Sequence, residues 1–244
     1  MIPKLNVMFA SMILDILYKD NHIVAVNKPH GLLVHRSSIA KNASEFAMQI
    51  LRDQINQHVF TIHRLDRKTG GVLLFALNED THRAMQKQFA ENLIKKTYRA
   101  IVRGYTEDEG VINYPLKRDD GKIQEALTKY KTLQQTEIDV PFGKFNTSRY
   151  SLVEIYPQTG RMHQIRKHFA HILHPIIADR PHGCNKQNKM FKEKFNMDTM
   201  LLHAKSVSFN HPYTNETINI TADIQSELKR MIKQLKFNSS ILND

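Results

Sequence analysis

The sequence predicts a mixed α+β fold in which a largely antiparallel central sheet is flanked by helices. Seven short runs are rich in β-branched and other apolar residues, as strands are. Four further segments repeat apolar residues every three or four positions, as helices do. Strands and helices do not alternate strictly along the chain, and strict alternation is typical of a doubly wound parallel sheet. The α+β class is therefore favoured.

The strands are expected at residues 22–27, 72–77, 98–103, 125–132, 148–156, 201–209 and 217–221. Several of them alternate polar and apolar side chains, most clearly over 150–156. Such alternation is typical of antiparallel strands with one face buried and one face in solvent. We therefore expect half-buried strands.

The helices are expected after Ser44, after Asp80, over 162–173 and from Asp223 onward. Their apolar faces are predicted, in that order, at Phe46, Ile50 and Leu51; Met85, Phe89 and Leu93; Met162, Ile165, Phe169 and Ile172; and Ile224, Leu228, Ile232 and Leu235. Pro175 ends the third helix region, because proline cannot continue a helix.

The composition indicates one folded domain. Of the 244 residues, 41% are hydrophobic and 24% are charged, which excludes a largely disordered chain. No repeat, low-complexity tract or linker is present, so we expect a single domain over 12–236, an N-terminal extension at 1–11 and a C-terminal tail at 237–244. The run 5–14 has roughly the length of a signal-peptide core, but Asn6 and Ser11 interrupt it, and Met12 is an alternative start.

Cysteine content and hydropathy indicate a cytoplasmic protein. Cys184 is the only cysteine, which excludes an internal disulfide and every CxxC motif. No apolar run approaches the roughly 18 residues of a membrane span, so no membrane association is expected. Nothing in the sequence points to an obligate protein partner.

The charge balance points to a polyanionic partner. Lysines and arginines number 35 against 24 acidic residues, giving a formal net charge of +11. Residues 161–194 hold eight of these cations against two acids, Asp179 and Glu193. Such a segment suits phosphate groups, and contacts of this kind make binding salt-dependent. The alternative is a solvated basic face without a partner.

One acidic residue lies in an unusually basic setting. Asp66 is surrounded by His63, Arg64, Arg67 and Lys68, just ahead of the apolar run 72–77, and two glycines follow that let the loop turn. Nearby positive charge favours the ionised carboxylate, which makes Asp66 a candidate nucleophile or base. The alternative is an aspartate that caps a turn and pairs with its basic neighbours.

Two further segments offer partners for such a site. Arg166 lies one residue from Ile165 on the predicted helix, at the edge of the buried stripe, from where its guanidinium could reach a carboxylate in a cleft. Tyr98 begins a strand among cations and is a natural stacking surface for a nucleobase. A packing role for either side chain is the alternative.

Taken together, five stretches resemble, in order, the motifs of the large-subunit-type (RluA) pseudouridine synthases: 27–35, 63–69, 96–99, 160–166 and 202–204. The resemblance extends over about 13–209. It implies the pseudouridine synthase fold with a catalytic cleft, and an isomerase that needs no cofactor and no metal. Within the family, 52–60 and 174–188 resemble a branch that acts on transfer RNA and has no N-terminal S4-type RNA-binding module.

The resemblance also implies roles for individual residues. Asp66 would be the catalytic carboxylate, Arg166 its partner, and Tyr98 the residue stacked on the target uracil. Arg64 would fill the gap that an extruded nucleotide leaves in the RNA helix. Further substrate contacts are implied for His63, Arg161, His163, Gln164, Lys28 and His203. Gly70 stands where the family usually has serine, and this departure is expected to loosen the loop.

The chemistry agrees with these residue types. Pseudouridine formation breaks the bond between N1 and C1′, turns the uracil and joins C5 to C1′, so nothing is oxidised. A carboxylate can attack the sugar or stabilise positive charge at C1′, as in glycosidases. A stem uridine must first leave its stack, which requires a wedge and a stacking platform. The branch resemblance points to the T-stem uridine at position 65 of transfer RNA.

The residues also allow other functions. The enzyme could act on ribosomal RNA, or the chain could be a non-catalytic RNA-binding protein of the same fold. A metal hydrolase would use the histidine cluster His163, His168, His171, His174 and His182, but no glutamate completes such a site and the neighbouring cations would repel a metal. A phosphotransferase of the Asp-x-Asp-x-Thr type would need a carboxylate where Lys68 stands.

Overall fold

The structure is a computed structural model, and it describes residues 12–35 and 45–242. The predicted N-terminal extension, 1–11, lies outside the described residues, as does Ser44. No helix of the described part has the length and apolar character needed to cross a membrane.

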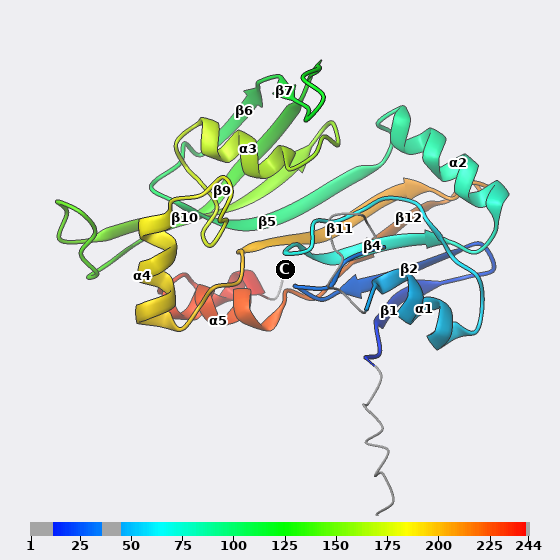
Figure 1. Cartoon of the computed structure of the whole chain (residues 1–244), viewed down its shortest axis with the longest axis horizontal. Coiled ribbons are helices and arrows are strands. Elements are labelled where there is room, and N and C mark those ends of the chain that lie inside the picture. The colour runs from blue at the N-terminus through cyan, green and yellow to red at the C-terminus, as the bar shows by residue number, and fades with distance from the viewer. Residues whose placement is uncertain (1–11, 36–44, 243–244) are drawn as a thin grey trace, which may run out of the picture.

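A ten-stranded sheet runs through the whole molecule (Figure 1). Its strands follow the order β1-β2-β4-β11-β5-β10-β9-β6, with β12 beside β11 and β3 beside β4. The bounds are β1 Asp15–Lys19, β2 Ile23–Lys28, β3 Phe60–Thr61, β4 Gly70–Ala76, β5 Lys95–Arg103, β6 Glu109–Asn113, β9 Leu127–Ile138, β10 Ser148–Pro157, β11 Leu202–Asn210 and β12 Thr217–Thr221. A separate ribbon pairs β7 Leu116–Lys117 with β8 Ile123–Gln124. Among the strand pairs of the described chain, β4 and β11 alone run parallel, so the predicted, largely antiparallel α+β class is confirmed.

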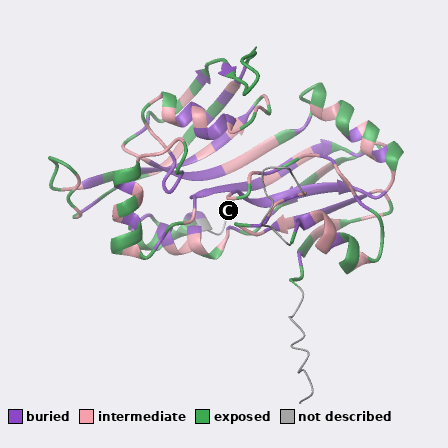
Figure 2. Ribbon diagram, viewed as in Figure 1, coloured by how far each residue is buried: buried purple, intermediate pink, exposed green. Residues whose placement is uncertain are grey.

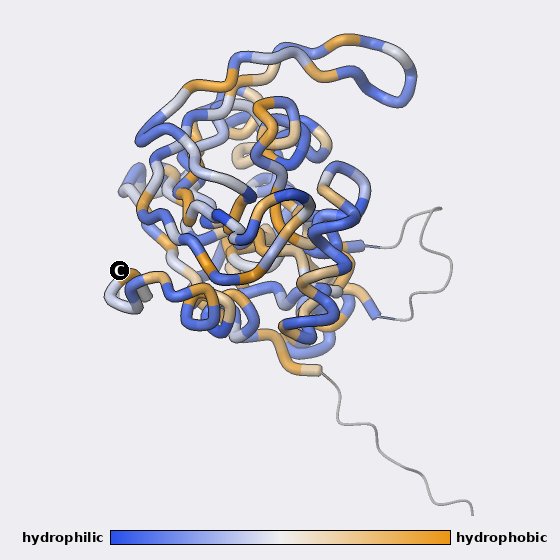
Figure 3. Tube along the Cα trace, turned by 90° about the vertical axis from the view of Figure 1, so that its left-hand side faces the viewer, coloured by the Kyte–Doolittle hydropathy of each residue, from blue (hydrophilic) through white to orange (hydrophobic). Residues whose placement is uncertain are grey.

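Five helices cover the described sheet: α1 Ala47–Ile55, α2 Glu79–Ala90, α3 Gln164–His171, α4 Asn185–Phe195 and α5 Ser226–Gln234. Helices α1 and α2 lie against the half of the sheet formed by β2 and β4, and α3, α4 and α5 against the half formed by β5, β10 and β9 (Figure 1). Hydrophilic segments dominate the outer loops of the molecule (Figure 3). The sheet therefore has two covered halves.

Both faces of the central strands are buried, which corrects the expectation of half-buried strands. In β4, Leu73 and Phe75 pack in the cluster that contains α1, whereas Val72 and Leu74 pack in the cluster that contains α2. All seven residues of β4 are buried, and the central strands are accordingly purple in Figure 2. Helices on both faces explain the difference, because each face then needs apolar side chains.

Some elements differ from the prediction, mainly where a helix or strand has few regularly spaced apolar residues. Helix α4 was not predicted, because only Gln187 and Phe191 of its eleven residues are buried and its other positions are mostly charged or amide side chains. The second helix ends at Ala90, which leaves Leu93 in the following turn, 59% exposed rather than on the apolar face. Strand β1 was missed as well, since it is short and has no fully buried residue.

The segment expected to be a C-terminal tail belongs to the core. Phe237 and Ile241 are 5% and 6% exposed and pack in the same cluster as α5. A short 3₁₀ helix, Ser239–Leu242, follows, and the backbone oxygen of Ile241 accepts a hydrogen bond of 2.7 Å from Nη1 of Arg99. The predicted domain boundary at 236 is therefore too early.

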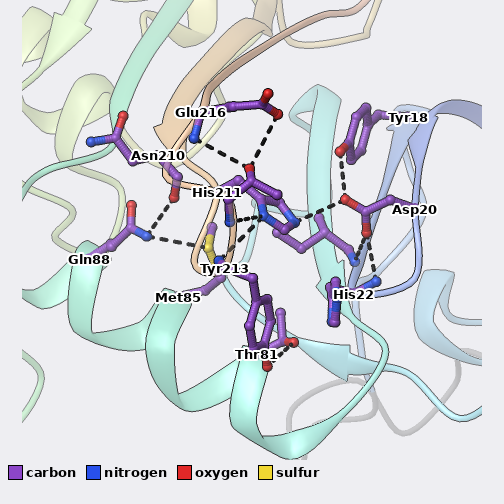
Figure 4. A network of polar contacts seen from close by, with 12 residues as sticks. Tyr18, Asp20, His22, Thr81, Met85, Gln88, Asn210, His211, Tyr213 and Glu216 are labelled. Atoms are coloured by element: carbon purple, nitrogen blue, oxygen red, sulfur yellow. Dashed lines mark hydrogen bonds and ion pairs between the residues drawn. The ribbon is translucent and has the colours of Figure 1, made fainter.

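A network of polar contacts fixes the amino-terminal end of α2 (Figure 4). The hydroxyls of Thr81 and Tyr213 are 3.2 Å apart, and the Tyr213 ring stacks on His22 with centroids 4.1 Å apart. His211, which is 4% exposed, places Nε2 3.1 Å from a carboxylate oxygen of Asp20. The turns before β2 and β12 are thus tied to α2, whose opposite end borders the cavity described below.

Strands β4 and β11 approach each other closely at Gly71. The parallel pairing of β4 with β11 consists of two residue pairs, His203 with Gly70 and Ala204 with Gly71. Gly71 has φ +110°, and a Cβ atom there would lie 2.1 Å from the backbone oxygen of Ala204. Only glycine combines this backbone conformation with so close an approach.

We expect Gly71→Ala to lower the free energy of unfolding by about 3 kcal/mol or more, because it adds a backbone clash to the strain of a positive φ. Gly143→Ala is the matched control, since Gly143 also has a positive φ (+62°) but has nothing within 4 Å of the added atom. The control should lose only about 1–2 kcal/mol. Urea denaturation of both variants measures the difference, and equal losses would contradict the close approach.

Candidate active site

A cavity of about 400 Å³ opens where the two halves of the sheet join. Its wall comes from the loop before β4, the end of α2, the start of β5, the turn after β10 and the start of α3. The ionisable side chains in the wall are His63, Arg64, Asp66, Lys96, Tyr98, Arg161, His163 and Arg166. With Leu202 of β11, residues from five separate stretches of the sequence therefore converge on one site.

Asp66 lies in the loop that leads into β4. The loop is held by a backbone hydrogen bond of 3.0 Å from the Thr69 nitrogen to the Asp66 oxygen. A second hydrogen bond, 2.8 Å long, joins the Gly31 nitrogen to the Arg67 oxygen. The carboxylate is 25% exposed and lines the cavity. It is thus fixed in place, yet a ligand can reach it.

Arg166 connects Asp66 to a second carboxylate. Its Nη1 donates a hydrogen bond of 2.8 Å to Asp66, while Nε and Nη2 donate bonds of 2.8 and 2.7 Å to the two oxygens of Asp179. The Arg166 side chain is 8% exposed and that of Asp179 is 1% exposed. These hydrogen bonds raise the pKa of Arg166 despite its burial. The guanidinium is therefore locked, with one N–H aimed at Asp66.

Asp179, which sequence reasoning did not assign to the site, is the second carboxylate that holds Arg166. Its backbone is anchored by Asn188 of α4, whose Nδ2 donates to the Asp179 oxygen at 2.8 Å and whose Oδ1 accepts from the Ala178 nitrogen at 2.9 Å. A signal existed in the sequence, because Asp179 directly follows an apolar run in a segment otherwise rich in cations. Its partner could not be read from that signal, since the two residues belong to different elements.

Tyr98 lies on β5 and faces the same cavity. Burial raises the pKa of its hydroxyl well above the ordinary value, and the nearby negative charge of Asp66 raises it further. The side chain therefore stays a neutral phenol at physiological pH. The ring packs against clusters on both halves of the sheet, so it forms a fixed platform in the wall.

His63, Arg64 and Arg161 also reach the cavity, as expected. The His63 ring stacks on Phe89 of α2 with centroids 5.0 Å apart, and its Nε2 accepts a hydrogen bond of 3.1 Å from the Leu74 nitrogen. Burial lowers the pKa of His63 to about 4. The Arg64 side chain is exposed. Arg161 is held by a 3.0 Å bond from Nε to the Glu125 oxygen.

Gln164 lines the cavity, but its amide is used within the protein. Its Oε1 accepts hydrogen bonds from the Thr159 hydroxyl at 2.7 Å and the Arg161 nitrogen at 3.0 Å. Its Nε2 donates to the Leu127 oxygen at 3.0 Å. Gln164 therefore shapes the turn ahead of α3. That helix begins at Gln164 rather than at Met162, which is 46% exposed instead of buried.

Lys28 and His203, which the resemblance assigned to substrate contacts, lie beneath the site and not in the cavity wall. Both side chains are 0% exposed. The Lys28 Nζ donates to the backbone oxygens of Pro29 and Leu32, each at 2.9 Å, and of Arg67 at 3.4 Å. Burial lowers its pKa to about 7, and Asp66 opposes that shift. The structure thus gives Lys28 a supporting position under the Asp66 loop.

Gly70 does not loosen the loop. It belongs to β4, and a Cβ atom there would lie 1.7 Å from the side-chain nitrogen of Gln225. The same nitrogen donates a hydrogen bond of 2.8 Å to the Lys28 oxygen. Gln225 therefore occupies the space that a larger residue at position 70 would need, which corrects the expectation for this departure.

The histidines do not converge as a metal hydrolase would require. His168 is buried, with its nitrogens 2.9 Å from the Thr128 hydroxyl and 3.0 Å from the Tyr114 oxygen. His174 lies 2.8 Å from the Arg103 oxygen instead. Within the described residues, no group of three or more potential ligands could hold a metal ion.

Both the sequence and the fold are similar to those of known proteins. Residues 22–171 match the family described as RNA pseudouridylate synthase. A protein of Vibrio parahaemolyticus named tRNA pseudouridine synthase C is 46% identical over 240 residues, covering 94% of this chain and 98% of that protein. A protein of the same name from Haemophilus ducreyi is 47% identical over 233 residues, covering 91% and 96%. The solved structure of Human RNA Pseudouridylate Synthase Domain Containing 4 is similar in fold, with a TM-score of 0.71 at 22% identity over 91% of this chain and 93% of that one.

We expect Arg166→Lys to lower the free energy of unfolding by at least about 2 kcal/mol, because an ammonium cannot bridge both carboxylates and leaves the buried Asp179 poorly paired. The control is Arg149→Lys, which alters an ion pair with Glu137 whose side chains are 58% and 35% exposed. That change should leave stability nearly unaltered, since exposed pairs contribute little. Thermal and urea unfolding decide, and equal losses in the two variants would refute the bridging role.

Stability should depend on pH through His203. Burial lowers its pKa to about 4 in the folded protein, whereas an unfolded chain takes up this proton near pH 6.5. Between those values the unfolded state binds more protons, so stability falls as the pH drops from about 6.5 to 4. We expect His203→Gln to reduce this slope by up to about 1.4 kcal/mol per pH unit. Urea denaturation at several pH values measures it, and parallel curves would contradict the assignment.

Proposed function

Since the chain belongs to the RNA pseudouridylate synthase family, we propose that its cavity isomerises a uridine of transfer RNA to pseudouridine. The observation that carries the proposal is the carboxylate of Asp66, which lines the cavity beside Tyr98 and is held 2.8 Å from the Arg166 guanidinium. The names of the Vibrio and Haemophilus relatives support transfer RNA as the substrate. The net charge of +11 suits a phosphate-rich partner.

The reaction requires little from the protein beyond placement and charge. The bond from N1 to C1′ breaks, the uracil turns, C5 joins C1′, and C5 loses its proton. Positive charge develops at C1′ as the base leaves, as it does in glycosidases. A fixed carboxylate next to that carbon lowers the barrier, whether it attacks C1′ or stabilises the charge. We assign this role to Asp66.

The neighbours of Asp66 serve its placement. Arg166 donates one N–H to the carboxylate and is itself held by both oxygens of Asp179. The carboxylate oxygen cannot swing away without losing this charge-assisted hydrogen bond. Rigid positioning of a reacting group is worth several kcal/mol of the barrier. Asp179 and Arg166 thus hold the Asp66 carboxylate in a fixed orientation before substrate binds.

The cavity suits a nucleotide that has left its helix. Its volume of about 400 Å³ falls within the roughly 300–1,000 Å³ of small-molecule sites. Tyr98 offers an aromatic face in the wall, on which a uracil can stack, and the exposed Arg64 at the rim can enter the gap left in the RNA. The base is thereby held while its sugar meets Asp66.

For the position in the transfer RNA, we assign the T-stem uridine 65. Two segments outside the general family motifs support this choice, 52–60 and 174–188, because they resemble the branch with that specificity. The second of them contains Asp179 and runs into α4, whose four exposed lysines can contact phosphates of a stem.

The experiment uses transfer RNA that carries tritium at C5 of uracil and follows the release of label. We expect Asp66→Asn to lower the rate by more than about 10²-fold, since the amide cannot stabilise charge at C1′. The control is Asp80→Asn, at an aspartate 85% exposed on α2, which should release label at the rate of the unsubstituted protein. Equal release by Asp66→Asn would remove Asp66 from its role, and a product at a uridine other than 65 would refute the assigned position.

A further inference from the structure

We propose that His163 and His182 form a two-imidazole relay, in which His163 accepts the proton lost from C5 of the uracil and passes it through His182 to solvent. The proposal rests on the proposed function and adds two residues to its mechanism. It is carried by a contact at the cavity: Nδ1 of His163 lies 2.9 Å from Nε2 of His182.

The reaction fixes where a proton acceptor must be. The proton leaves C5 when that atom is bonded to C1′, and C1′ is the atom on which Asp66 acts. An acceptor must therefore lie within a few bond lengths of the Asp66 carboxylate. His163 meets this condition, since its Nε2 is 3.8 Å from Oδ2 of Asp66 and its side chain lines the cavity.

The backbone holds His163 in this orientation. The residue precedes α3 and adopts φ 55° and ψ 26°, a left-handed conformation that is uncommon for residues other than glycine. This turn presents one ring nitrogen to Asp66 and the other to His182. His182 is half-buried in the segment between Asp179 and α4, so part of this residue is accessible to solvent.

The other ionisable groups that line the described cavity are poorly suited to accept this proton. Tyr98 is a neutral phenol, because burial and Asp66 raise its pKa. His63 already accepts the Leu74 N–H at Nε2. Lys96 lies over the ring of Phe89, on the α2 side of the cavity. Arginine side chains stay protonated and have no free acceptor. His163 remains as the base beside Asp66.

The charges around the pair agree with an uncharged resting state. Burial lowers the pKa of both histidines. Asp66 and Asp179 oppose this shift, whereas Arg166 and Lys167 add to it. The net effect leaves both imidazoles neutral at physiological pH. A neutral imidazole can accept a proton at one nitrogen while it donates from the other.

The proton balance is complete. Nε2 of His163 takes the C5 proton as the C–H electron pair restores the uracil ring. The proton on Nδ1 of His163 moves to Nε2 of His182, and His182 releases its own Nδ1 proton to water. After the product leaves, Nε2 of His163 gives its proton to water, His182 takes a proton from water at Nδ1 and returns the one on Nε2 to Nδ1 of His163, which restores both starting tautomers. The uracil N1, which kept the electron pair of the broken bond to C1′, takes a proton from water. The product therefore has the composition of the substrate.

The test measures kcat on transfer RNA with hydrogen or deuterium at C5 of uracil. His182→Gln keeps a hydrogen-bonding side chain at this position but cannot relay a proton. We expect kcat to fall about 10²-fold with KM unchanged, and the deuterium isotope effect on kcat to exceed that of the unsubstituted enzyme. His182→Ala should lose the same rate, and free imidazole in the buffer should restore it.

The matched control is His171→Gln, because His171 lies on the same helix as Arg166, is exposed, and stacks on Tyr114 instead of facing the cavity. It should retain both kcat and the isotope effect. An unchanged kcat in His182→Gln overturns the relay, as does a lower kcat without a larger isotope effect or rescue by imidazole, since a structural role would produce that pattern. If the unsubstituted protein is inactive on transfer RNA, the proposed function and the relay both fail. If it is active and only the His182 results differ from expectation, the relay alone fails.

Discussion

The site depends on one buried cation shared by two carboxylates. Arg166 is almost inaccessible, and a guanidinium in such a place is stable only when its N–H groups have charged acceptors. Asp179 supplies two of these acceptors from the protein interior, and Asp66 supplies the third from the cavity wall. Because the interior pair fixes the cation, the cation fixes the carboxylate that faces the cavity.

The architecture explains how the side chains of the site are held in position. Asp66 precedes β4, Tyr98 lies on β5 and Arg166 on α3, and these elements meet where the two halves of the sheet join. Helices cover both faces of each half, and the central strands that carry the site are largely buried (Figure 2). The polar network at the amino-terminal end of α2 completes the frame (Figure 4).

Local sequence patterns predicted those strands and helices in which buried apolar residues recur at the spacing of the element. They missed α4 and β1, because these elements bury few residues and the apolar period is then absent. In the site, Asp66 was recognisable from the cations beside it in the sequence. Asp179 and the pairing of His163 with His182 were not, since those contacts join segments that only the folded chain brings together. Lys28 and His203 match motifs of the family, and sequence reasoning therefore expected them to contact substrate. In the structure both side chains are buried outside the cavity wall.

The central claim is that the carboxylate of Asp66, aimed by Arg166, meets C1′ of an everted uridine. The most direct measurement is a crystal structure of the protein bound to transfer RNA with 5-fluorouridine at the target position, because fluorine replaces the hydrogen that the reaction must remove. The account predicts a nucleotide outside the RNA helix, its base on Tyr98 and its C1′ in contact with Asp66, while Arg166 still bridges both carboxylates. A target nucleotide that occupies this cavity with C1′ away from Asp66 would contradict it.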